Sequence, residues 1–310
     1  MSPLARGALF GIGAASIWGG MYVVSDAVLP VIPPFTLLSL RLLISIGVLG
    51  LVMWRLKPSR PDGRAIYGRI LLAGFVGFGI SLGAQFVGTD LANAVSGALI
   101  TSASPAFILV FAVLLLHERL TGLRVVSVAL ATIGVVVIIN PAAAALDSGA
   151  FLGNLALAVA AMTWGLYSVM VRQVSGRVDT LTFSFLAPVG GLVLTLPAAA
   201  VELQSRPVGP ITPAVIAGVL YLGVISTALA MWMWNRAFAL VDASTASLFF
   251  FAQPLVGAIL GVLLLGQSLT PTLWIGGGLI GAGVALAIAG DRRSRPTPPA
   301  ASDQAAGTAT

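Results

Sequence analysis

Long apolar segments recur along this chain and restrict it to folds that a lipid bilayer can solvate. A transmembrane helix needs about 20 apolar residues. Only 8% of the residues are charged, whereas soluble domains average about 25%. We therefore predict an all-α membrane protein with ten transmembrane helices. The predicted spans, separated by Pro, Gly and charged residues, are 7–29, 34–54, 67–89, 92–116, 121–139, 151–172, 179–201, 213–236, 242–265 and 272–290.

The basic residues predict how these helices are oriented. If the N-terminus lies in the cytoplasm, all 16 Lys and Arg residues except Arg41 and Arg206 fall on the cytoplasmic side. The positive-inside rule then places both termini in the cytoplasm, as an even number of spans requires. We expect a multi-pass protein of a bacterial inner membrane. Its first apolar run is longer than a signal-peptide core, so we interpret it as a retained helix.

Charge and motif content narrow the possible partners. A net charge of +6 would favour nucleic-acid binding in a soluble protein. Here the basic residues lie between apolar blocks, so the expected partner is the lipid bilayer and not nucleic acid. The chain has no cysteine and no HExxH, GxSxG or P-loop motif. We therefore expect no catalytic residue, no metal and no cofactor.

Two stretches of the chain repeat each other. The sequence LLLHERLT at 114–121 follows Pro105, and LLLGQSLT at 263–270 follows Pro254 at the same spacing. The pair Trp18-Gly19 recurs as Trp164-Gly165. Five helices per half is an odd number, so the second half is predicted to be inverted relative to the first. The predicted organisation is a first repeat at 1–139, a linker at 140–150, a second repeat at 151–290 and a disordered cytoplasmic tail at 291–310.

These features resemble the EamA-type branch of the drug/metabolite transporter superfamily, and the size resembles the YddG-like bacterial amino-acid exporters. The resemblance implies an exporter or exchanger of amino acids, sugars, nucleotide-like metabolites or drugs. One departure concerns the acidic residue that the family pattern favours after both helices four and nine. This chain has Glu118 in the first position but Gln267 in the second.

Repeated aromatic residues are the first candidates for a substrate site. Trp18 and Tyr22 share one face of the first helix, and Trp164 and Tyr167 share one face of the sixth. Aromatic side chains at such positions also pack between helices or face lipid. The repeat favours a cavity role, because equivalent positions in the two halves face one axis.

Polar residues before the two matching prolines are the second set of candidates. A proline inside a helix frees a backbone carbonyl, which a helix break at Pro105 or Pro254 would expose to protein, water or cargo. One half offers hydroxyls and the other an aromatic ring and an amide, so we infer an amphipathic cargo. Small polar residues also serve helix packing. The candidates are Thr101 and Ser104 before Pro105, Phe250 and Gln253 before Pro254, and Gln85, whose amide would need a partner inside the membrane.

Arg41 is the one basic residue predicted to lie well inside a helix. It could contact a carboxylate of the cargo, or it could snorkel or bond to a carbonyl. No carboxylate is predicted at mid-membrane, which argues against a proton-coupled exporter of cationic drugs.

The leading hypothesis is a secondary transporter that exports or exchanges amino acids or similar small amphipathic metabolites by alternating access. Efflux of hydrophobic or cationic drugs is the alternative. An integral membrane enzyme and a lipid-handling or receptor protein are hypotheses from other classes. The sequence leaves the oligomeric state open between a monomer and a homodimer.

Overall fold

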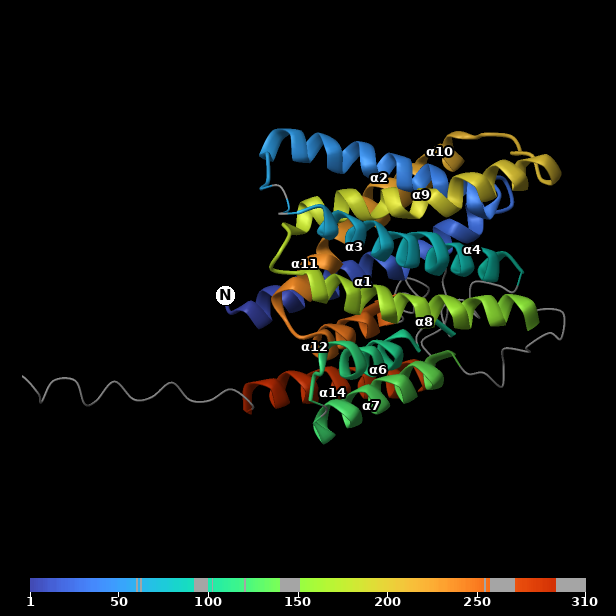
Figure 1. The fold of residues 1–310 in the computed structure, drawn as a ribbon. Helices are drawn as coiled ribbons and strands as arrows, with labels where there is room; N and C mark the ends of the chain where they lie inside the picture. The colour runs from blue at the N-terminus through green and yellow to red at the C-terminus, as the bar shows by residue number, and fades with distance from the viewer. Residues whose placement is uncertain are drawn as a thin grey trace, which may run out of the picture.

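A computed structural model describes residues 1–59, 61, 63–91, 100–101, 103–119, 121–139, 151–253, 255–256 and 271–293. The regular elements within these ranges are helices, together with one isolated bridge between Ser175 and Val178. Most of the helices run side by side along a common direction (Figure 1). The predicted linker 140–150, and the tail beyond residue 293, lie outside the described residues.

Six helical stretches are long and apolar enough to cross a membrane. Four are continuous helices: α1 Pro3–Val28, α2 Pro34–Leu56, α8 Phe151–Val174 and α9 Thr180–Ser205. The described part of the chain is therefore that of an all-helical membrane protein, as the apolar blocks predicted, although each helix begins or ends a few residues away from its predicted limit.

The other two stretches each contain a π-helical segment. Residues 64–91 form α3 Arg64–Gly74, η1 Phe75–Ser81 and α4 Leu82–Leu91. Residues 213–240 form α10 Pro213–Leu220, η3 Tyr221–Leu229 and α11 Ala230–Leu240. A π-helix is rare and often marks a functional position. The apolar pattern did not predict either segment.

The remaining described elements are shorter or border undescribed residues. They are α6 Ser104–Leu116, α7 Gly122–Ile139, α12 Ala243–Ser247, the 3-10 helix η4 Leu248–Phe251 and α14 Pro271–Arg293. The predicted spans 92–116 and 242–265 are therefore described only in part.

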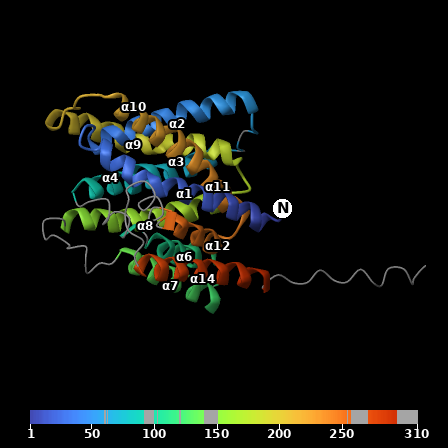
Figure 2. The ribbon, with the colours of Figure 1, turned by 180° about the vertical axis from the view of Figure 1, so that it is seen from behind.

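The helices pack in pairs across the molecule. α2 packs against α9, α7 against α14, and α1 against α11, while α8 contacts both α4 and α6. Two opposite views place α2 and α9 at one edge and α7 and α14 at the other, with α1 and α8 between them (Figures 1 and 2). The core of the molecule thus lies between helices from the two halves of the chain.

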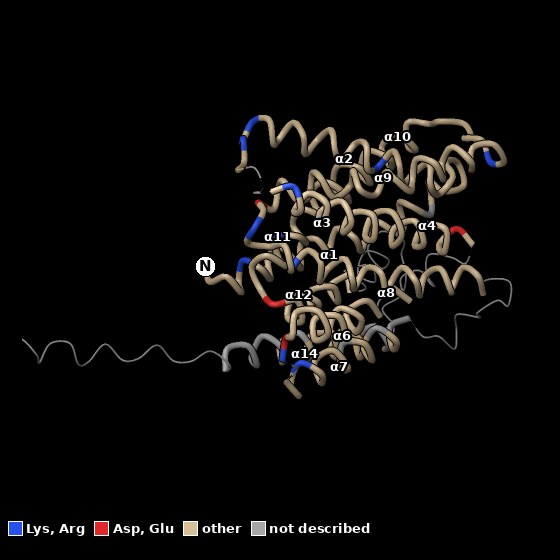
Figure 3. The backbone as a smooth tube through the Cα atoms, viewed as in Figure 1, with Lys and Arg blue, Asp and Glu red and all other residues tan. Residues whose placement is uncertain are grey.

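The surface is apolar along the helices and charged at their ends. Large side chains such as Leu43, Leu72 and Val193 are exposed on the outer faces, as expected of side chains in contact with lipid tails. Lys and Arg gather at the end of the bundle where the N-terminus lies, and few are found at the opposite end (Figure 3). Arg206 lies at that opposite end, directly after α9.

Helices α3 and α9 approach each other through glycine. A Cβ added to Gly74 would lie 1.8 Å from the backbone oxygen of Ala187, and one added to Gly190 would lie 2.1 Å from the backbone oxygen of Leu71. Only glycine lets two helix backbones touch in this way. Helix α9 is therefore held in place by two contacts that no other residue permits.

Replacing Gly74 by alanine should destabilise the protein, because the new methyl group meets backbone and forces the helices apart, at a cost of about 1–3 kcal/mol. Gly68→Ala is the matched control: Gly68 lies in the same helix, and its added Cβ meets nothing within 4 Å. Thermal unfolding in detergent should show a lower midpoint for Gly74→Ala and an unchanged or higher midpoint for Gly68→Ala. Equal midpoints would contradict this packing.

Candidate functional site

Four aromatic side chains meet at the centre of the molecule. The ring centroid of Trp18 in α1 lies 5.4 Å from that of Trp164 in α8 and 5.3 Å from that of Trp234 in α11. Phe250 in η4 lies 6.2 Å from Trp18 and 5.7 Å from Trp234. All four side chains are buried, so helices from both halves of the chain converge on one aromatic cluster.

A small cavity lies beside this cluster. About 20 Å³ is open to the centres of water molecules, which is room for one or two waters. Among the described residues, none that lines the cavity is charged. Its walls are formed by Trp18, Met21, Tyr22, Ser81, Leu82, Gln85, Thr101, Ser104, Ala160, Trp164, Met231, Phe250 and Gln253.

The structure brings eight of the nine predicted substrate residues to this one cavity. They are Trp18, Tyr22, Gln85, Thr101, Ser104, Trp164, Phe250 and Gln253. Tyr167 is the exception, since it lies behind Trp164 with ring centroids 5.1 Å apart. Its hydroxyl donates to Oδ1 of Asn235 at 2.8 Å and is fully buried. Tyr167 therefore supports the cavity wall without lining it.

The cavity has one polar wall and one aromatic wall. On the polar side, the hydroxyl of Tyr22 lies 2.8 Å from Oγ1 of Thr101, and Ser104 donates to the backbone oxygen of Thr101 at 2.6 Å. On the aromatic side, the indole N–H of Trp164 is buried with no hydrogen-bond partner among the described residues. A buried donor without a partner is costly, so this N–H favours a ligand that brings an acceptor.

The π-helical segments shape the cavity from both halves. Ser81 in η1 lines it directly. In η3, the widened turn presents the backbone oxygen of Ser226 to the indole N–H of Trp18 at 2.9 Å. Tyr221, also in η3, donates to the backbone oxygen of Ile17 at 2.8 Å. These bonds fix the orientation of Trp18 within the cluster.

Arg41 lies behind the cavity wall, fully buried in α2. Its Nε donates to Oγ1 of Thr227 at 3.0 Å, and its guanidinium carbon lies 4.9 Å from the ring centroid of Phe86. One Nη atom has no partner, and no ion pair joins Arg41 to a described carboxylate. Met21 contacts the guanidinium and also lines the cavity. An unpaired positive charge therefore lies one side chain away from the cavity.

Of the two predicted helix breaks, at Pro105 and Pro254, the structure describes the one at Pro105. The chain makes a turn at Ala103, and α6 begins at Ser104 with Pro105 in its first turn. Proline is favoured there because its missing N–H would be unpaired in any case. Pro254 lies outside the described residues.

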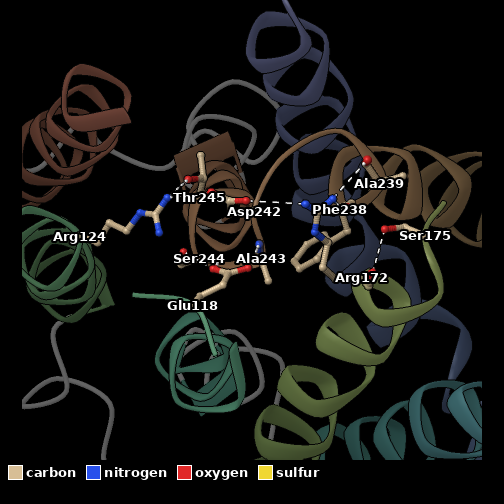
Figure 4. Close-up of polar contacts among 10 residues, drawn as sticks. All are labelled: Glu118, Arg124, Arg172, Ser175, Phe238, Ala239, Asp242, Ala243, Ser244 and Thr245. Carbon is tan, nitrogen blue, oxygen red and sulfur yellow. Dashed lines mark hydrogen bonds and ion pairs between the residues drawn. The ribbon is translucent and has the colours of Figure 1, made fainter. Parts of the chain in front are cut away.

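A carboxylate joins two helical segments at the arginine-rich end of the molecule. Glu118, after α6, accepts hydrogen bonds from the backbone N–H groups of Ala243 and Ser244 at 2.9 and 3.2 Å. The hydroxyl of Ser244 donates to the same carboxylate at 2.6 Å. Glu118 thus binds the N-terminus of α12 through three hydrogen bonds (Figure 4).

Two arginines hold the same segment from the other sides. Arg124 of α7 and Arg172 of α8 form ion pairs with Asp242 at 3.0 and 3.6 Å. Arg172 also donates to the backbone oxygens of Phe238 and Ala239 (Figure 4). The start of α12 is therefore connected to α6, α7 and α8.

A second carboxylate joins two helices at the opposite end. Glu202 of α9 accepts from the backbone N–H groups of Phe35 and Thr36 at 3.2 and 2.9 Å, and from Oγ1 of Thr36 at 3.1 Å. Arg206 donates to Asp90 at 3.1 Å, and this hydrogen bond raises the pKa of Arg206. We call the groups around Glu118 and Glu202 the two carboxylate clasps.

Sequence reasoning missed several parts of this site. Trp234 is fully buried in the cluster, but no counterpart in the first half marks it. No sequence pattern marks Glu202, because its partners on α2 lie more than 160 residues away. The structure has no cluster of metal-ligating side chains among its described residues.

Comparison with known proteins identifies the family. The EamA-like transporter family model matches residues 5–140 and again residues 151–289. This chain belongs to the EamA-like transporter family. The resemblance seen in the sequence is thereby confirmed.

Several relatives carry transporter names. An uncharacterized transporter of Clostridium kluyveri is 28% identical over 67% of this chain and 68% of its own length. The uncharacterized transporter YetK of Bacillus subtilis is 25% identical over 87% of this chain and 83% of its own length. Protein PecM of Dickeya dadantii is 28% identical over 86% of this chain and 87% of its own length. The family and the first two names indicate a membrane transporter and make an enzyme a poor description of this EamA protein.

A solved crystal structure shares the fold. It superimposes with a TM-score of 0.78 and 21% sequence identity, covering 94% of this chain and 99% of its own.

Replacing Arg41 by methionine should leave the protein as stable or make it more stable. The change removes a buried charge that has no ion-pair partner among the described residues, and burying such a charge is costly. Arg206→Met is the matched control and should lower the thermal midpoint in detergent, because it leaves Asp90 unpaired. A midpoint for Arg41→Met below that of Arg206→Met would contradict this description of Arg41.

Proposed function

We propose that this EamA protein is a secondary transporter that exports or exchanges amino acids or similar small amphipathic metabolites by alternating access. The observation that carries the proposal is the central cavity. It lies between helices from both halves and is lined by hydroxyl, amide and indole groups.

The transporter is built, in this proposal, from two inverted repeats of five helices, with both termini in the cytoplasm. Three features support the duplication. The family model matches the chain twice. The π-helical segments begin at Phe75 and Tyr221, a separation of 146 residues (221 − 75) that also relates Trp18 to Trp164 (164 − 18). The pairings of α1 with α11 and of α8 with α4 join corresponding helices of the two halves.

Alternating access follows from unequal opening of the two clasps. The cavity has room for only one or two waters, so cargo can enter only after one end opens. At the arginine-rich end, the Glu118 clasp joins the segment after α6 to the start of α12. At the opposite end, the Glu202 clasp joins α9 to the start of α2. Breaking one clasp at a time would expose the cavity to one side of the membrane at a time.

An amphipathic cargo fits the two walls of the cavity. Tyr22, Thr101 and Ser104 can bond a polar head, while Trp18 and Phe250 can pack against an apolar side chain. Arg41 supplies a positive charge nearby, which favours a cargo that carries a carboxylate. The aromatic, uncharged lining also favours hydrophobic drugs, which are the second candidate cargo.

Counterflow in liposomes tests the proposal. Purified protein, reconstituted with an unlabelled amino acid inside, should accumulate the labelled amino acid from outside with saturable kinetics. Trp164→Ala and Gln253→Ala should each reduce this exchange roughly tenfold, the equivalent of about 1.4 kcal/mol of lost binding. Trp54→Ala and Gln173→Ala are matched controls at exposed positions and should exchange normally.

Two results would overturn parts of the proposal. Absence of saturable exchange for every amino acid, with exchange of a hydrophobic drug, would replace the cargo and keep the site. Normal exchange by both cavity variants would show that cargo binds elsewhere.

A further inference from the structure

A second, larger hollow lies on the outside of the helix bundle. It is a groove of about 830 Å³ between α1, α2, η3 with α11, and the start of α9. Apolar side chains form most of its walls, among them Phe10, Leu49, Val224 and Trp232. Val52 and Leu229 also line it and are exposed, so the groove faces outward toward the bilayer.

The groove ends in a basic, polar hollow at the arginine-rich end of the bundle. Arg6 and Arg236 line the groove, and a neighbouring hollow of about 380 Å³ is lined by Arg177 and again by Arg236. No ion pair joins these three arginines to a carboxylate within the described part of the chain. Asp179 is the acidic residue in both hollows, and its Oδ1 already accepts the backbone N–H of Leu181 at 2.8 Å.

We propose that this groove is a binding site for an anionic phospholipid. Its acyl chains lie along the apolar walls, and its phosphate is bound by Arg6 and Arg236, with Arg177 beside them. Three arginines against one aspartate give the mouth of the groove a net positive charge, which matches an anionic headgroup and not a zwitterionic one. Basic hollows between transmembrane helices bind anionic headgroups for this reason.

The lipid site is distinct from the central cavity. The two share no lining residue. They are linked through η3, because Val224 and Ile225 line the groove while the next residue, Ser226, accepts the hydrogen bond of Trp18. A bound lipid therefore contacts the helix segment that positions Trp18, without occupying the space where cargo would bind.

Tryptophan quenching by brominated lipids tests this site in the full-length protein. Trp232 lines the groove, so the quenching that is present in wild type and absent in Trp232→Phe reports on groove lipid alone. Membranes of phosphatidylcholine and phosphatidylglycerol are prepared with bromine on the acyl chains of one lipid at a time. Brominated phosphatidylglycerol should quench the Trp232 signal more strongly than brominated phosphatidylcholine at equal mole fraction.

Arginine variants test the role of the headgroup. Arg6→Gln and Arg236→Gln should each reduce the preference for phosphatidylglycerol roughly fivefold, since one basic residue near a lipid surface contributes about that factor. Arg64→Gln and Arg69→Gln alter exposed arginines of α3 that do not line the groove and should leave the preference unchanged. Equal quenching by the two lipids, no quenching of Trp232, or an unchanged preference in both groove variants would overturn the proposal. Each of these outcomes leaves the transport proposal intact.

Discussion

Polar groups inside a bilayer must find partners within the protein, and this requirement governs the structure around the cavity. The π-helical turn of η3 presents the backbone oxygen of Ser226, and the indole N–H of Trp18 binds it. In the reverse direction, the hydroxyl of Tyr221 binds the backbone oxygen of Ile17. The π-helical segment η3 and the helix α1 are thus joined by hydrogen bonds from aromatic side chains of both, and these bonds hold Trp18 in the cavity wall.

Two groups near the centre remain incompletely compensated. The indole N–H of Trp164 and one Nη of Arg41 are buried without a partner in the described structure. Each is expensive in a medium of low polarity. A protein tolerates a group such as the Trp164 N–H where another molecule completes it, and Trp164 lines the cavity. Arg41 lies behind the wall and adds a positive charge nearby, so both groups favour a cargo that carries a carboxylate.

The clasps have the energetic scale that a transporter requires. Hydrogen bonds to a charged group contribute roughly 1.5–3 kcal/mol each, and less where water reaches them. A few such bonds can hold one end of the molecule closed, yet cargo binding can offset them, because 1.4 kcal/mol changes a population tenfold. Glu118 and Glu202, which have this role in the proposed transport cycle, share one arrangement: each accepts from two backbone N–H groups and one hydroxyl at a helix start.

The sequence predicted the helices well because apolar length is a direct requirement of the bilayer. It also predicted eight of the residues that line the cavity, because the Trp-Gly pair occurs twice in the sequence and polar residues precede Pro105. It did not predict η1 or η3, since a π-helical turn leaves no apolar periodicity to detect. Trp234 and the partners of Glu202 were missed for a different reason. Their roles depend on contacts between distant helices, which no local pattern records.

The most direct test of the central claim is access to the cavity from each side of the membrane. The chain has no cysteine, so Ser104→Cys would place a single thiol in the cavity wall. In oriented vesicles, a membrane-impermeant thiol reagent should label this residue from both sides, and cargo should slow the labelling. Adding Glu118→Ala should speed labelling from the arginine-rich end, and adding Glu202→Ala should speed it from the opposite end. Labelling from one side only in all three proteins would contradict alternating access through this cavity.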